Sequence, residues 1–212
     1  MKQILDKRVV PVAVIDKAED AVLVAEALQA GGLDIIEVTF RTAAAGDAIK
    51  QIAAKFPQML VGAGTILTGD QVRKAIDCGA KFGVSPGLNE KVVAQANSLK
   101  LPFVPGVMTP SEVERAMDLG CKLLKFFPAE NAGGVKMLKA LAGPYGHTGV
   151  KFIPLGGVTA MNAAEYLALP IVGAIGGSWL IEKSVVAERN WQEITRRTAA
   201  ILQLAARTKS AG

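Results

Sequence analysis

Lys125 is the residue whose setting in the sequence points most directly to chemistry. It stands in Leu-Leu-Lys-Phe-Phe-Pro, residues 123–128, a run typical of a strand buried on both faces. If the alternate residues pack on helices, Lys125 points inward with Leu123 and Phe127. Burial lowers the pKa of a lysine and leaves a neutral amine that can attack carbonyl carbons. The pattern predicts a Schiff-base lysine; the alternative is a strand-end lysine that reaches solvent or pairs with a carboxylate.

Glu37 is the second charged residue inside an apolar run, Ile-Ile-Glu-Val-Thr-Phe at 35–40, and it shares parity with Thr39 and Arg41. A carboxylate in a closed apolar site takes a raised pKa and can act as general acid and base, although a structural Glu–Lys ion pair is the alternative. Arg41 has the forked donors that suit a substrate carboxylate, but a loop arginine can equally solvate helix ends. Thr65 ends a neighbouring run with a hydroxyl and a backbone N–H, which by itself is weak evidence.

Two glycine pairs follow the last two strand-like runs, Gly156-Gly157 and Gly176-Gly177. Glycine lets backbone N–H groups approach an anion, and the start of a following helix adds its positive end. Barrel enzymes frequently bind phosphate in these two loops, and Ser178 adds a hydroxyl donor. The two pairs together favour a phosphate site over the alternative of two tight turns without a ligand.

A repeating architecture must position these residues: short β-branched runs, each followed by an amphipathic stretch. The eight runs begin near Val9, Ile35, Leu60, Phe82, Phe103, Leu123, Lys151 and Ile171, and helical patterns cover 19–30, 43–55, 71–78 and 110–119. The spacing fits one strand, one helix and two short loops. We expect one domain over 1–212, an α/β (β/α)8 TIM barrel with its site at the carboxyl ends of the strands. A doubly wound open sheet is the alternative, disfavoured because no Gly-x-Gly-x-x-Gly turn follows the first strand.

The composition limits the classes of protein and ligand to be considered, and the chain ends carry their own structural signals. Half of the 212 residues are hydrophobic, 20% are charged and 5% are aromatic, which excludes a disordered chain and predicts an aliphatic core. The net charge of +5 is carried by scattered Lys and Arg, a pattern that attracts anionic substrates but does not indicate nucleic-acid binding. We expect residues 1–8 to form a short helix that closes the barrel bottom, and 207–212 to form a frayed tail.

Scarce histidine and cysteine exclude several chemistries. His147 is the one histidine, which excludes any Ser-His-Asp or Cys-His arrangement that needs a second imidazole and any metal site with several His ligands; we expect no metal and no cofactor. Cys78 and Cys121 show no metal or disulfide spacing, which favours a reducing, cytoplasmic location. No signal peptide is expected, and the longest uncharged run, 166–181, is shorter than the about 20 residues of a membrane span.

Six motifs in one order resemble the bacterial 2-keto-3-deoxy-6-phosphogluconate (KDPG) and 2-keto-4-hydroxyglutarate (KHG) aldolases. The resemblance implies a class I aldolase that splits KDPG into pyruvate and glyceraldehyde 3-phosphate, on a small barrel that assembles as a homotrimer. It implies that Lys125 is the Schiff-base lysine and Glu37 the acid/base. The motifs lie at 36–42, 62–65, 85–87, 105–110, 125–130 and 176–180.

The same resemblance implies the substrate contacts. Arg41 and Thr65 would hold the pyruvyl carboxylate, and Pro86 and Phe127 would line the pocket. The resemblance also implies that the phosphate end is surrounded by Gly156, Gly157, Gly177 and Ser178.

Leu155 departs from the family pattern, which commonly has Pro-Thr-Gly-Gly where this chain has Pro-Leu-Gly-Gly. By parity with Ile153 it should reach the pocket, where it replaces a hydroxyl with an apolar side chain. We therefore expect Leu155 to alter substrate preference without changing the lysine chemistry.

Other functions remain open at this stage. With the same lysine, the main activity could be cleavage of KHG or of the galactonate epimer, or decarboxylation of oxaloacetate. A barrel isomerase would keep the phosphate site and a carboxylate but form no imine. A non-catalytic barrel scaffold is the third possibility.

Overall fold

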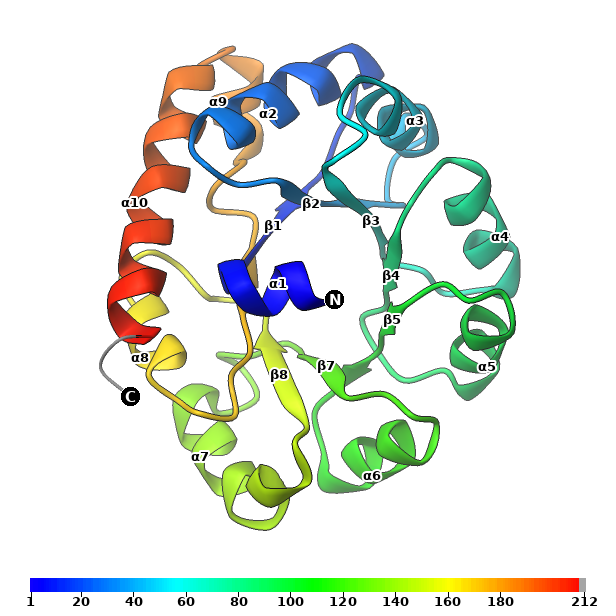
Figure 1. Ribbon diagram of the computed structural model, residues 1–212, viewed down its shortest axis with the longest axis vertical. Helices are drawn as coiled ribbons and strands as arrows, with labels where there is room; N and C mark the ends of the chain where they lie inside the picture. Colours follow the sequence, from blue (N-terminus) through cyan, green and yellow to red (C-terminus); the bar gives the residue numbers. More distant parts are fainter. Residues whose placement is uncertain (210–212) are drawn as a thin grey trace.

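The structure, a computed structural model, describes residues 1–209, with short parallel strands gathered around the middle of the molecule and helices outside them (Figure 1). The strands are β1 Val9–Ala13, β2 Ile35–Thr39, β3 Leu60–Gly64, β4 Phe82–Val84, β5 Phe103–Val104, β6 Gly106–Val107, β7 Leu123–Phe126, β8 Lys151–Pro154 and β9 Ile175–Gly177. The helices are α1 Lys2–Lys7, α2 Ala18–Ala30, α3 Ala45–Lys55, α4 Gly69–Asp77, α5 Glu90–Ser98, α6 Pro110–Asp118, α7 Gly134–Tyr145, α8 Ala163–Leu167, α9 Lys183–Ala187 and α10 Trp191–Lys209, with a 3-10 turn at Gly146–Thr148.

The expected closed eight-stranded TIM barrel is wrong. The strands form two parallel sheets: a six-stranded sheet in the order β5-β4-β3-β2-β1-β9, and a three-stranded sheet in the order β6-β7-β8. The architecture is a half-barrel with a small second sheet, an α/β fold related to the barrel, in which regular strand pairing does not continue around the whole ring.

Both breaks in the ring have local causes. Pro105 has no N–H to continue a strand ladder, so the chain pairs with β4 up to Val104 and with β7 from Gly106 onward. Near the eighth predicted strand start, Val172 forms only an isolated bridge to Phe152, and the regular strand β9 begins at Ile175. Gly173 lies between them, and glycine weakens a strand.

The positions of the elements follow the sequence pattern more closely than the closure does. The predicted starts of the first seven strand runs are confirmed, and the predicted helix at 110–119 is α6, Pro110–Asp118. Proline at its first turn and a capping box between Thr109 and Glu112 fix where α6 begins.

The chain ends pack against the rest of the fold. The expected N-terminal helix is α1, which lies over the middle of the ring of strands in Figure 1. Its Ile4 is fully buried. The expected tail at 207–212 begins inside α10, which continues to Lys209; residues 210–212 lie outside the described part of the chain. Within 1–209, no helix combines the length and apolarity that a membrane span requires.

Candidate active site

Glu37 and Lys125 are buried charged side chains on strands of the two sheets. Glu37, on β2, is 1% exposed, and Lys125, on β7, is 7% exposed. The Lys125 ammonium nitrogen lies 4.9 Å from the centre of the Phe127 ring, as expected for two side chains on one face of a strand. The structure thus buries both residues predicted to carry the chemistry.

The buried carboxyl of Glu37 is affected by two positive charges, those of Lys125 and Arg41. Burial raises the pKa of its carboxyl, and the charges of Lys125 and then Arg41 partly offset that rise. Among residues 1–209, Glu37 Oε1 has no hydrogen-bond partner, and Glu37 and Lys125 form no ion pair. The alternative of a structural ion pair is therefore not observed, and a carboxyl oxygen is left for another partner.

Gly64 and Thr65 adjoin the Glu37 carboxyl. Gly64 is paired with Thr39 across β2 and β3, and a Cβ on Gly64 would lie 2.0 Å from Glu37 Oε1. Thr65 follows with a φ of 57°, a left-handed conformation unusual for a branched residue. The sequence pattern did not single out Gly64, although a glycine beside a charged residue on the neighbouring strand is a signal for close approach.

Thr39 and Arg41, which share the parity of Glu37, are hydrogen-bonded to each other at the end of β2. Arg41 Nε donates to Thr39 Oγ1 over 3.2 Å, and Thr39 Oγ1 donates to the Ala13 carbonyl over 3.3 Å. Arg41 is exposed, and the bond to Thr39 uses one of its five N–H donors. Its guanidinium is held beside the site with donors left for an anionic ligand.

The two glycine turns lie in contact with each other. A Cβ on Gly176 would lie 2.8 Å from Leu155 Cγ, and a Cβ on Gly177 would lie 3.3 Å from the Val158 carbonyl oxygen. Gly156 and Gly157 have φ values of 90° and 86°, which L side chains rarely adopt. Leu155 and Gly177 are buried, whereas Gly157 and Ser178 are exposed.

Phe127 and Pro86 connect these turns to the lysine strand. A Cβ on Gly156 would lie 3.2 Å from the Phe127 ring, so this ring packs against the first glycine turn. The Pro86 carbonyl oxygen would lie 2.1 Å from a Cβ on Gly106, the residue paired with Lys125 across β6 and β7. Glu37 and Lys125 thus lie within strands β2 and β7, and the other predicted site residues lie at the carboxyl ends of strands or in the loops that follow.

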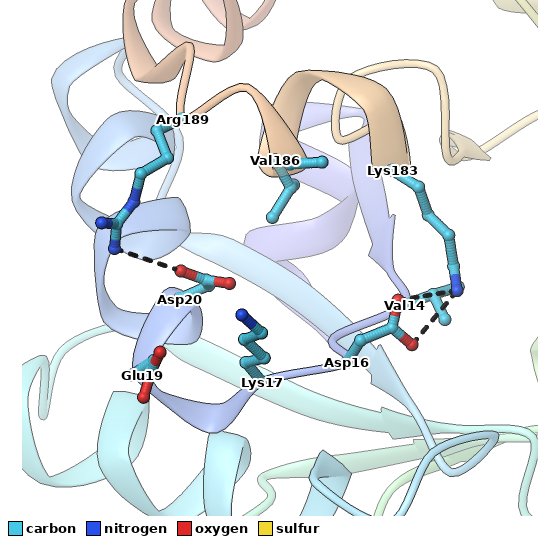
Figure 2. A pocket seen from close by; sticks show the side chains of 9 residues that line it. Val14, Asp16, Lys17, Glu19, Asp20, Lys183, Val186 and Arg189 are labelled. Atoms are coloured by element: carbon cyan, nitrogen blue, oxygen red, sulfur yellow. Dashed lines mark hydrogen bonds and ion pairs between the residues drawn. The ribbon is translucent and has the colours of Figure 1, made fainter.

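A separate charged pocket follows β1 and faces α9, and its lining includes none of the predicted site residues (Figure 2). Its charges are largely paired: Lys183 Nζ lies 2.8 Å from Asp16 Oδ2, and Arg189 Nη2 lies 3.6 Å from Asp20 Oδ1. We assign these pairs to docking α9 onto the start of α2. For the part of the chain described, no group of three or more His, Cys, Asp and Glu side chains could hold a metal ion.

An α/β fold with a buried lysine and a buried carboxyl on its strands supplies the nucleophile and the acid/base group that a lysine-dependent lyase acting on carbonyl compounds requires. The family model described as "KDPG and KHG aldolase" matches residues 1–197, and the chain belongs to this family of carbon–carbon lyases. The resemblance predicted from the motifs is confirmed.

Curated relatives match over most of their length. The 2-dehydro-3-deoxy-phosphogluconate aldolase of Haemophilus influenzae is 43% identical, with 96% of this chain and 97% of that protein aligned. The KHG/KDPG aldolase of Escherichia coli K12 is 46% identical, with 89% of this chain and 87% of that protein aligned.

Solved structures agree in fold. The KDPG aldolase of Legionella pneumophila, with pyruvate captured as a covalent carbinolamine intermediate, superposes with a TM-score of 0.90 at 39% identity, covering 94% of this chain and 97% of that one. The Zymomonas mobilis KDPG aldolase with 3-phosphoglycerate has a TM-score of 0.81 at 38% identity, covering 93% and 97%.

Proposed function

We propose that this protein is a class I aldolase that cleaves KDPG to pyruvate and glyceraldehyde 3-phosphate through a Schiff base on Lys125. The observation that carries the proposal is the burial of Lys125 and Glu37 together: the charge of Lys125 acts on the pKa of the Glu37 carboxyl, whose Oε1 has no hydrogen-bond partner among the described residues. The carbinolamine captured in the Legionella relative supports the same chemistry here.

The first half of the mechanism builds an electron sink. The neutral amine of Lys125 attacks the C2 ketone and forms a carbinolamine. Glu37, in its acid form, gives a proton to the leaving hydroxyl, and loss of water leaves a protonated imine. The raised pKa of Glu37 suits this step, because burial keeps the carboxyl able to carry a proton.

The second half breaks the carbon–carbon bond. Glu37, now a carboxylate, takes the proton of the C4 hydroxyl through a water, and the C3–C4 bond breaks. Its electron pair moves to the imine nitrogen, so that glyceraldehyde 3-phosphate leaves and an enamine of pyruvate remains. Glu37 returns the proton to C3, and water hydrolyses the imine to free pyruvate and Lys125. The imine does the work that a divalent ion performs in metal-dependent aldolases, so the proposal includes no metal and no cofactor.

The remaining side chains bind and orient the substrate in this proposal. Arg41 and Thr65 hold the pyruvyl carboxylate, beside Glu37. Pro86, Phe127 and Leu155 form the apolar wall. The phosphate lies against Gly156, Gly157, Gly177 and Ser178, in two turns that are in contact with each other. Glycine in such turns lets backbone N–H groups approach an anion. The 3-phosphoglycerate in the Zymomonas relative supports a phosphorylated ligand.

We extend the proposal to the assembly and location of the protein. The chain is one aldolase domain over 1–212, works as a homotrimer and resides in the cytoplasm. The free, buried Cys78 and Cys121 are consistent with a reducing compartment. Mass measurement in solution at several protein concentrations tests the trimer.

A second activity with the same lysine is KHG cleavage, favoured by the name of the Escherichia coli relative. Oxaloacetate decarboxylation would use the same imine. Relative kcat/KM values for the three substrates decide which activity dominates.

Borohydride trapping with pyruvate is the direct test. Reduction of the imine should inactivate the enzyme irreversibly and add the mass of reduced pyruvate to Lys125. Lys125→Ala should abolish both effects. Lys122→Ala, at an exposed lysine three residues before Lys125, should abolish neither. Full activity after treatment would refute the Schiff base and favour an isomerase, and absence of any aldol activity would favour a scaffold.

A further inference from the structure

Glu130, which is exposed, and Tyr166, which is buried, form a contact to which the sequence assigned no role. Glu130 lies in the loop after β7, and its carboxylate accepts a hydrogen bond from Tyr166 Oη on α8. Tyr166 is fully buried, and burial, followed by the bond to Glu130, raises the pKa of its hydroxyl. The tyrosine is thus a neutral donor, and it holds a carboxylate in one orientation.

The main chain and methylenes of Glu130 lie over the first glycine turn. Glu130 N donates to the Gly156 carbonyl over 3.0 Å. A Cβ on Gly157 would lie 2.4 Å from Glu130 Cγ and 2.7 Å from its Cβ. The stem of Glu130 therefore packs directly on Gly157, and the turn cannot change shape without moving Glu130.

The carboxylate end of Glu130 lies on the other side, at the start of α7. A Cβ on Gly134, which begins α7, would lie 3.1 Å from Tyr166 Oη and 3.3 Å from Glu130 Oε1. Because the atoms of Glu130 nearest Gly157 are carbons, its negative charge is directed away from the exposed side of that turn. The pair joins three segments: the loop after β7, the loop after β8, and α8.

We propose that Glu130 and Tyr166 are positioning residues that fix the Gly156–Gly157 turn and turn the Glu130 charge away from the phosphate, and so set the preference for a phosphorylated substrate. This rests on the proposed function, in which the turn binds the phosphate. Without the tyrosine hydroxyl, the carboxylate is released to rotate toward an anion bound at the turn, and like charges repel. The reacting end of the substrate, held by Lys125 on the strand, is not affected.

The test compares KDPG with 2-keto-3-deoxygluconate, which differs only in lacking the phosphate. We measure kcat and KM for both substrates in the wild type, Tyr166→Phe, Glu130→Ala and Glu130→Gln. Both Tyr166→Phe and Glu130→Ala should raise the KM for KDPG about tenfold with kcat retained. Tyr166→Phe loses one hydrogen bond to a charged group, and Glu130→Ala loses the stem that packs on Gly157 and fixes the turn. Both should leave kcat/KM for the unphosphorylated substrate within about twofold. Glu130→Gln keeps an acceptor for Tyr166 and should retain most of the preference.

Proton exchange at the pyruvate methyl group is the second readout, since it needs Lys125 and Glu37 but no phosphate. It should be the same in all four proteins. An equal loss of kcat/KM on both substrates would overturn the proposal, because it would show that the pair has a merely structural role. An unchanged KM for KDPG would also overturn it. If Tyr166→Phe does not fold, Glu130→Ala at the exposed partner decides alone. Failure of the proposed function itself is distinct: the wild type would then show no pyruvate exchange and no trapping.

Discussion

The side chain of Glu37 occupies the place that a side chain on Gly64 would need. A Cβ on Gly64 would lie 2.0 Å from Glu37 Oε1 and 2.8 Å from its Cδ, far inside van der Waals contact. Because Glu37 is buried in the strand layer, its carboxyl cannot swing into solvent to make room. The absent side chain of Gly64 therefore determines where the carboxyl of Glu37 lies.

Gly64→Ala should displace the Glu37 carboxyl and slow proton transfer. We expect pyruvate methyl-proton exchange to fall about 100-fold, within the range that a positioned general acid/base contributes. Borohydride trapping at Lys125 should persist at a reduced rate. Exchange followed by NMR, together with the mass of the trapped protein, checks both.

Gly143→Ala is the matched control for that substitution. Gly143 is exposed on α7, and a Cβ there would meet nothing within 4 Å. Alanine in a helix is more favourable than glycine by about 0.5 to 1 kcal/mol, so this variant should be slightly more stable and equally active. Unchanged exchange in Gly64→Ala would contradict the positioning argument.

Glu37→Gln should change how stability depends on pH. The pKa of Glu37 in the folded protein lies above its ordinary value of 4.5, first because of burial. Above about pH 4.5 the folded state therefore holds more protons than the unfolded state, so wild-type stability falls as pH rises through this window. Gln carries no proton to lose, and its stability relative to wild type should rise with pH by at most about 1.4 kcal/mol per unit. Urea unfolding at intervals from about pH 4.5 to 8 measures the difference.

Glu193 on α10 provides a control of opposite sign. Hydrogen bonds from Arg196 and then Arg197 lower its pKa to about 2. The stability that Glu193 contributes is present above its unfolded pKa and is lost as pH falls through about 2. Glu193→Gln should thus differ most from wild type near neutral pH and least in acid. A Glu37→Gln difference that stays flat or shrinks as pH rises would refute the raised pKa.

Strand and helix positions were predictable because they depend on local patterns. The β-branched run at 35–40 and the Thr109-Pro110 start of a helix each carry their own signal, whatever the rest of the chain does. Closure of the sheet was not predictable in this way. It depends on the interruption at Pro105, before which the chain pairs with β4 and after which it pairs with β7, and on the single bridge at Val172. Both are pairings between strands that are distant in sequence.

The residues of the site also differ in whether local sequence patterns could predict them. Lys125 and Glu37 could be predicted since a charged residue inside an apolar strand is conspicuous and strand parity gives its direction. The Glu130–Tyr166 bond could not, because its partners lie 36 residues apart and neither stands in an unusual local pattern. Gly64 carried a weak signal that only the register with β2 makes clear.

The capping box of α6 should contribute measurably to stability. Glu112 N donates to Thr109 Oγ1 over 3.4 Å, and Thr109 N donates to Glu112 Oε2 over 2.8 Å. Thr109→Ala should lower the free energy of unfolding by about 1 kcal/mol, while Thr109→Ser, which keeps the hydroxyl, should lower it by less than half as much. Equal losses in the two variants would assign the effect to the methyl group rather than to the cap.

Leu155→Thr should shift substrate preference toward KDPG. Leu155 is buried, and its branched end packs on the backbone of Gly176, where a Cβ would lie 2.8 to 3.0 Å from its carbons. An apolar contact offers nothing to a hydroxyl of the sugar acid, whereas threonine can donate or accept a hydrogen bond. One such bond corresponds to a factor of about 2 to 10 in kcat/KM. The ratio of kcat/KM for KDPG to that for oxaloacetate should therefore rise by this factor.

Leu155→Val separates the hydroxyl from the change in size, because valine has the shape of threonine without its oxygen. If the hydroxyl is responsible, valine should leave the ratio within about twofold of wild type while threonine raises it. If valine raises the ratio as much as threonine does, the space opened beside Gly176 is responsible and Leu155 acts by bulk alone. If neither variant changes the ratio, Leu155 does not touch the part of the substrate in which KDPG and oxaloacetate differ, and its role in specificity is refuted.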